Sequence, residues 1–183
     1  MERNEEHTWE ETKKVGDEFE EFSAIDIKIK KYPNAYVDDR GKKFDWWDIY
    51  VSETIKIECK NDKKGFTTEN ICIEVGCDGK PSGLKVTEAE YWLISGGVKT
   101  FLIKTTDLKR LVKEEYDDKL KRVWEDEDYI PNLNGIQYQL KRPVNQGNGT
   151  TKYMDWYLIP QQFFAKFCLE VGVGDKMTYD KLI

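Results

Sequence analysis

The chain has 183 residues, the size of one ordinary domain whose core needs no disulfide or metal to hold it. Its aromatic content of 13% excludes a disordered chain, and its net charge of -6 excludes a uniformly basic nucleic-acid binder. No apolar run approaches the roughly 20 residues that span a bilayer, and the acidic first residues resemble no secretion signal. We therefore expect a cytoplasmic protein without a membrane partner.

The first part of the chain predicts a helix followed by strands. Apolar residues recur at helical spacing from Thr8 to about Ala24, whereas the alternation at 25–29 predicts the opening of a strand. A loop, or a loop with a short edge strand, is expected next at 32–43. Two strands that form a hairpin are expected after it, at 46–52 and 54–60.

The second part predicts further strands and two helices. In chain order they are a strand, a hairpin around Gly96-Gly97, a helix, a strand and a closing helix, at 71–75, 91–105, 106–122, 152–159 and 161–171. This order predicts a single α/β (α+β) domain over residues 1–183, with a central mixed β-sheet flanked by helices.

Histidine and cysteine usage limits the possible chemistry. The single histidine, His7, lies near one end, so Ser-His-Asp, Cys-His and histidine-dependent nuclease mechanisms lack their usual proton carrier. The cysteines lack the spacing of a zinc site: Cys59, Cys72, Cys77 and Cys168. Carboxylates, lysines and metal ions remain as the expected reagents.

One charged group stands out inside the predicted hairpin. In the stretch TIKIECK, alternation places Cys59 with the isoleucines on one strand face, and Glu58 and Lys60 on the other. If the preceding strand pairs antiparallel with this one, Asp48 lies toward the same end of the hairpin as Lys60. Two carboxylates can hold Mg²⁺, and a lysine can orient a nucleophile and offset charge on phosphorus. The alternative is an amphipathic hairpin whose charges form weak surface pairs.

Asp45 competes with Asp48 for the metal-binding role. Asp48 immediately precedes the alternating run 49–51, which places it at the start of a strand. Asp45 is expected in the approach loop. We therefore prefer Asp48.

These residues carry a resemblance to a known family. The series from Asp48 to Glu58-Cys59-Lys60 resembles the D…(D/E)-x-K signature of the PD-(D/E)XK nuclease superfamily, although Trp47 replaces the usual proline. The segments NICIE at 70–74 and GKPSG at 79–83 resemble a phage and viral branch of that superfamily. The similarity covers roughly residues 9–122, with an echo at 145–160. For a viral chain, the expected location is the host cytoplasm.

The resemblance implies a restriction-endonuclease-like fold and a Mg²⁺- or Mn²⁺-dependent endonuclease. It implies that Asp48, Glu58 and the backbone carbonyl of Cys59 bind the metal ion, and that Lys60 is the catalytic lysine. Glu20 resembles an acid that many members carry on the first helix, although it is also one of several neighbouring helix-surface acids. DNA is favoured over RNA, with branched or structured DNA in replication, recombination or repair as the expected substrate.

Several residues near this motif keep two interpretations. Glu74 is either an extra ligand or, as we prefer, a salt-bridge partner of Lys60. Four turn residues either contact backbone phosphate or are simply solvated, and the sequence favours neither interpretation. These residues are Lys63, Lys64, Lys80 and Ser82. The rival functions are a catalytically inactive nucleic-acid-binding module on the same fold and a structural protein. The sequence leaves open whether the protein forms a homodimer.

Overall fold

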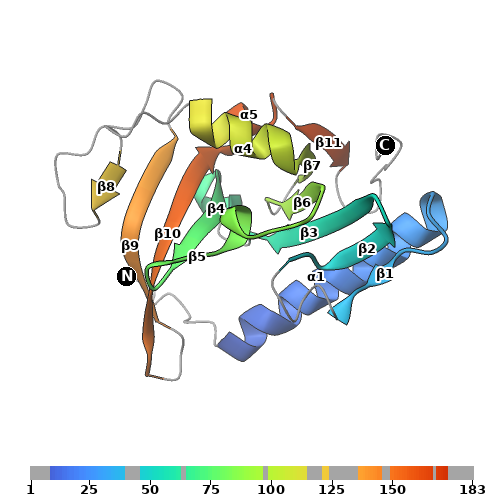
Figure 1. Ribbon diagram of the computed structural model, residues 1–183, viewed down its shortest axis with the longest axis horizontal. Helices are drawn as coiled ribbons and strands as arrows, with labels where there is room; N and C mark the ends of the chain where they lie inside the picture. Colours follow the sequence, from blue (N-terminus) through green and yellow to red (C-terminus); the bar gives the residue numbers. More distant parts are fainter. Residues whose placement is uncertain are drawn as a thin grey trace.

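The computed structural model describes residues 9–39, 46–62, 65–96, 99–114, 121–123, 136–145, 149–166 and 168–172. Across these residues the chain forms two β-sheets and a small number of helices, shown in Figure 1. The mixed α/β architecture with a central mixed sheet is confirmed. The second sheet was not predicted.

The central sheet contains both parallel and antiparallel pairs. Its strands lie in the order β1 (Tyr36–Val37), β2 (Ile49–Ser52), β3 (Ile55–Asn61), β6 (Tyr91–Ser95), β7 (Thr100–Lys104) and β11 (Leu169–Gly172). β3 pairs parallel with β6, and the other neighbours pair antiparallel. The predicted hairpins at β2–β3 and β6–β7 are therefore present.

The second sheet is built largely from the later part of the chain. Its strands lie in the order β5 (Lys80–Pro81), β4 (Asn70–Cys77), β10 (Thr151–Pro160), β9 (Gln137–Asn145) and β8 (Lys121–Val123). The connection from β3 to β6 thus leaves the central sheet, contributes β4 and β5 to the second sheet, and returns. Two short helical segments belong to this connection: α3 (Gly65–Thr68) and η1 (Gly83–Lys85).

Helix α1 (Trp9–Lys30) is longer than predicted. The expected strand at 25–29 is its final two turns, so that prediction is wrong. The alternating isoleucines also satisfy helical spacing, since Ile27 is fully buried while Ile25 and Ile29 are exposed. An ion pair of 2.8 Å between Lys30 and Asp26, four residues apart, supports the last turn.

Two other helices are shorter than predicted. Helix α4 covers Thr105–Glu114, and the last two residues of the expected helix, 121 and 122, instead belong to β8. Helix α5 covers Gln161–Phe164, after which Leu169–Gly172 pairs with β7 as β11. In both cases a pairing with a strand distant in sequence prevails over local helical spacing.

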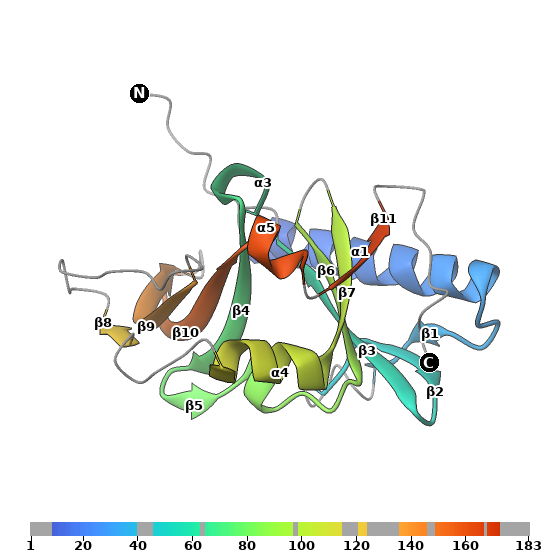
Figure 2. The same ribbon diagram turned by 90° about the horizontal axis from the view of Figure 1, so that it is seen from above.

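The central sheet has a core on each face. On one face, which we call the α1 face, Tyr91, Leu93 and Leu102 pack with Ala24 and Ile27 of α1. On the other, the α4 face, the neighbouring residues of β6 and β7 pack with α4 and the second sheet, namely Trp92, Ile94, Phe101 and Ile103. Figure 1 shows α4 and α1 on opposite sides of these strands, and Figure 2 shows β4, β9 and β10 beside them. None of the helices in the described ranges is long and apolar enough to cross a membrane.

Candidate active site

The predicted division of β3 into two faces is present. Ile55 and Ile57 are buried on the α1 face. Glu58 and Lys60 are in register with Trp92 and Ile94 of β6, whose side chains lie in the core on the α4 face. Because residues paired across parallel strands share a face, Glu58 and Lys60 point to the α4 face together.

Asp48 lies where β2 separates from β3. The pairing of these strands begins at Ile49 and Ile57, and the N–H of Asp48 still donates to the carbonyl of Ile57 at 3.0 Å. One step further, the Oδ2 atom of Asp48 accepts a hydrogen bond from the N–H of Cys59 at 2.7 Å. A carboxylate therefore replaces the backbone acceptor that a continued strand would provide, and it lies beside the strand that carries Glu58 and Lys60.

The backbone of Cys59 is oriented toward Asp48. In a strand, the N–H and C=O of one residue point to the same neighbour. Since the N–H of Cys59 bonds the Asp48 carboxylate, its carbonyl points to that side and away from β6. The Cys59 side chain is partly buried and packs against the core on the α1 face. This geometry agrees with the carbonyl role that the family resemblance implies.

Lys60 is surrounded by acidic groups. Burial of the side chain would lower the pKa of its ammonium, but Cys72 and the carboxylates of three nearby residues together raise that pKa above its ordinary value: Glu74, Asp62 and Glu58. Lys60 therefore remains a cation at neutral pH. An ammonium in this state donates hydrogen bonds and stabilises negative charge, and it does not act as a base.

Asp62 organises this part of the site, a role that sequence reasoning missed. Its carboxylate accepts hydrogen bonds from the N–H groups of Gly65 at 3.1 Å and Cys72 at 2.8 Å. It is buried and joins the end of β3 to β4, which brings Cys72 and Glu74 near Lys60. An Asp three residues before a Gly is a turn signal.

Glu74 and the turn beside it lie at the edge of the site around Lys60. The Glu74 carboxylate contributes to the raised pKa of Lys60, as expected of a charge partner. A side chain at Gly83 would place its Cβ 2.5 Å from the Glu74 carbonyl oxygen, so this turn is packed closely against β4. Ser82 is partly buried next to Gly83, and Lys80 is exposed in β5. Lys63 and Lys64 lie outside the described residues.

The other two candidate acids are placed differently. Glu20 lies three, four and seven residues before Ser23, Ala24 and Ile27, on the side of α1 that faces the sheet. Helix α1 packs on the α1 face, so Glu20 approaches β3 from the side opposite Glu58 and Lys60. Asp45, the alternative to Asp48, lies outside the described residues.

The oxygen donors suit a hard divalent cation. Asp48 and Glu58 supply carboxylates and Cys59 a carbonyl, and Mg²⁺ commonly binds one or two carboxylates while it keeps several waters. Within the described ranges, no three Asp, Glu, His or Cys side chains gather closely enough to hold a metal ion. Any site here would therefore have few protein ligands and would be completed by water or substrate.

Comparison with known proteins does not identify the family. No family model, curated protein or solved structure matches this chain. The nuclease assignment therefore depends on the residue pattern and on the geometry described above.

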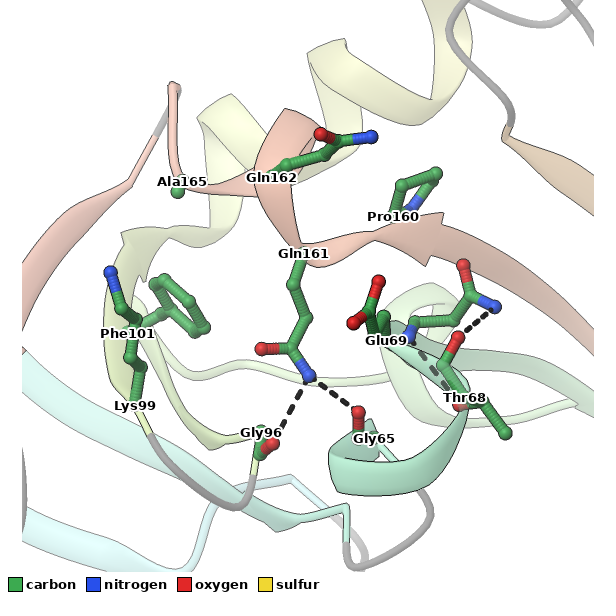
Figure 3. A pocket seen from close by; sticks show the side chains of 11 residues that line it. Gly65, Thr68, Glu69, Gly96, Lys99, Phe101, Pro160, Gln161, Gln162 and Ala165 are labelled. Atoms are coloured by element: carbon green, nitrogen blue, oxygen red, sulfur yellow. Dashed lines mark hydrogen bonds between the residues drawn. The ribbon is translucent and has the colours of Figure 1, made fainter.

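A cavity of about 600 Å³ lies apart from these residues, between α3, α5 and the turn after β6. Figure 3 shows Gln161 in it, with its Nε2 atom donating to the carbonyls of Gly65 at 2.7 Å and Gly96 at 3.0 Å. These bonds connect three segments that are distant in sequence. The cavity lining does not include Asp48, Glu58 or Lys60, so this cavity is separate from the candidate site.

Proposed function

We propose that this protein is a Mg²⁺-dependent nuclease that hydrolyses phosphodiester bonds in DNA. The observation that carries the proposal is the hydrogen bond from Cys59 to the carboxylate of Asp48, which holds this acid beside the strand that presents Glu58 and Lys60. Two acids can hold a metal ion and a lysine can stabilise charge on phosphate oxygens, and these are two tasks of metal-assisted phosphodiester hydrolysis.

Each residue has a distinct role in this proposal. Asp48, Glu58 and the carbonyl of Cys59 would hold Mg²⁺, which when bound would polarise the phosphate and lower the pKa of an attacking water. Lys60 stays protonated, so it would donate a hydrogen bond toward the phosphate oxygens and offset their developing charge. Glu74 is one of the groups that raise the pKa of Lys60, and it would help to keep this ammonium charged.

The finer fold assignment belongs to the same proposal. We propose that the central sheet is restriction-endonuclease-like, supported by its mixed pairing and by the acid–lysine pair on its parallel strand β3. Lys80 is exposed on the turn beside Glu74, where it would contact backbone phosphate together with Lys63 and Lys64. The Oγ atom of Ser82 is buried, so a phosphate contact by Ser82 would require this turn to open. Branched or structured DNA is the proposed substrate, and the cytoplasm is the proposed location.

The direct test is a cleavage assay with purified protein. Labelled duplex, single-stranded, junction and RNA substrates would be incubated with Mg²⁺, with Mn²⁺ or with a chelator. We expect cleavage of DNA that requires the metal ion. Wild-type protein that neither binds divalent ions in calorimetry nor cuts any substrate would refute the nuclease proposal and favour the inactive binding module.

Two variants separate metal binding from chemistry. Glu58→Gln should lose affinity for Mn²⁺ in calorimetry, whereas Lys60→Met should keep both metal and DNA binding. Each should lower the cleavage rate by about 10²–10³-fold, the usual effect of removing one electrostatic stabiliser. Lys56→Met is the matched control, because Lys56 shares the strand and face of Lys60 but lies over the ring of Trp47, 4.6 Å from its centroid. Equal losses in the Lys56 and Lys60 variants would contradict the assigned role of Lys60.

A further inference from the structure

Helix α1 has a second apolar stripe that faces away from the sheet. Phe22, Ile25 and Ile29 are 46%, 57% and 78% exposed, although their spacing of three and four residues places them on one helix face. The buried residues Ala24 and Ile27 lie on a different face, against the central sheet. Figure 1 shows α1 along the outside of the molecule. A helix that is apolar on two sides is expected to have a partner on each side.

Two exposed charges of opposite sign flank this stripe. Glu21 precedes it and Lys28 follows it, and their spacing of seven residues places them on the same side of the helix. Lys13 and Lys14 are also exposed before the stripe, and Lys14 pairs with Glu18 at 3.9 Å. Neither Glu21 nor Lys28 forms an ion pair within the part of the chain that the structure describes.

This surface of α1 is complementary to the same surface of a second copy when the two helices run antiparallel. Coiled-coil packing repeats about every 3.5 residues, which assigns Phe22 and Ile29 to one core position and Ile25 to the other. In an antiparallel pair, Phe22 would face Ile25 of the partner subunit, and Glu21 would lie beside Lys28 of the partner subunit. A parallel pair would instead bring Glu21 near Asp26 of the partner subunit, which repels it.

We propose that α1 is the interface of an antiparallel, two-fold symmetric homodimer centred on Phe22 and Ile25. A second copy is favoured over an unrelated protein because a two-fold contact would pair Glu21 of each subunit with Lys28 of the partner subunit at two symmetric places. The stripe is short, so the interface is smaller than the roughly 1,200 Å² of stable complexes and the dimer should dissociate in the micromolar range. This proposal is independent of the nuclease activity.

The test is sedimentation analysis of the full chain over a concentration series. We expect wild-type protein to form dimers at tens of micromolar, an order-of-magnitude expectation for an interface of this size. Ile25→Asp should be monomeric with an unchanged circular dichroism spectrum, since this side chain is exposed. Tyr153→Ser is the matched control, because Tyr153 is 52% exposed on β10, and it should leave the dimer intact.

Charge exchange provides the decisive comparison. Glu21→Lys and Lys28→Glu should each weaken the dimer by about tenfold, because each replaces attraction with repulsion at two symmetric places. The double variant should restore wild-type dimerisation. A wild-type monomer at all concentrations, an unaffected Ile25→Asp dimer, or a double variant no better than the single variants would each overturn the proposal.

Discussion

The carboxylate of Asp48 accepts a hydrogen bond of 2.7 Å from the backbone N–H of Cys59, across the end of the β2–β3 hairpin. This bond holds Asp48 beside Glu58 and Lys60. It also gives Asp48 a structural role that is separable from its proposed charge-dependent role. Substitutions that keep or remove the acceptor oxygen should therefore have different effects.

Asp48→Asn and Asp48→Ala should separate the two roles. Alanine removes the acceptor from the N–H of Cys59 and should lower the free energy of unfolding by about 1–3 kcal/mol. Asparagine keeps an acceptor oxygen, so its stability loss in urea unfolding should be smaller, while cleavage should still fall by about 10²-fold or more. Asp45→Asn should have a mild effect on cleavage. If the Asp45 variant were inactive and Asp48→Asn active, Asp45 would be the metal ligand.

Lys60 should make stability depend on pH in the alkaline range. Burial lowers the pKa of Lys60, but Cys72 and three carboxylates raise it to a net value above the ordinary 10.5 of the unfolded chain. A raised pKa stabilises the folded state below the unfolded pKa, and this stabilisation is lost as pH rises through the folded pKa.

The measurement compares wild type with Lys60→Met in urea unfolding. The difference in free energy of unfolding should stay constant from neutral pH to about pH 10 and shrink above it. A stability of the wild type that instead rises relative to Lys60→Met between about pH 8 and pH 10 would mean that burial dominates and that the pKa of Lys60 is lowered.

Gly83 should be the most sensitive of three glycines to alanine substitution. Its φ of +49° disfavours a side chain, and an added Cβ would lie 2.5 Å from the carbonyl oxygen of Glu74. We expect a loss of about 2 kcal/mol or more. Gly79→Ala has the same backbone restriction with open space around it and should cost about 1 kcal/mol. Gly16→Ala, inside α1 with nothing within 4 Å, should stabilise by about 0.5–1 kcal/mol. An equal loss at Gly83 and Gly79 would argue against the close packing at Glu74.

Cys168 should resist alkylation in the native protein. Burial raises the pKa of its thiol well above the ordinary value, so the reactive thiolate is scarce at neutral pH. Mass spectrometry after iodoacetamide treatment should show Cys168 unmodified in native buffer and modified in urea. Equal modification in both conditions would contradict the burial of this residue.

The loop lysines should contribute to the salt dependence of DNA binding. Replacing Lys63 and Lys64 with Ala should reduce the slope of log K against log salt by up to about two phosphate contacts, each near 0.9. Lys109→Ala, an exposed change on α4, is the control and should leave the slope unchanged. An unchanged slope in the double variant would remove this loop from the interface.

The sequence by itself determined the geometry of the β2–β3 hairpin and the division of β3 into two faces. Strand side chains alternate with a period of two, so the positions of Ile57, Glu58 and Lys60 relative to one another follow from their order. Asp48 is near Cys59 because a tight hairpin pairs residues that are close in sequence. These relationships are local and can be predicted without the rest of the fold.

Only the tertiary structure decided what surrounds that hairpin. Pairing of β10 with β4 and of β11 with β7 joins segments that are far apart in sequence, and it makes the last residues of the predicted closing helix a strand. The same distant contacts place Glu74 near Lys60 through the buried bonds of Asp62. Periodicity reports which face of an element is apolar, but it does not report which other segment covers that face. That choice depends on burial and hydrogen bonding across the whole chain, which is why the charge environment of Lys60 could not be read from its neighbours in sequence.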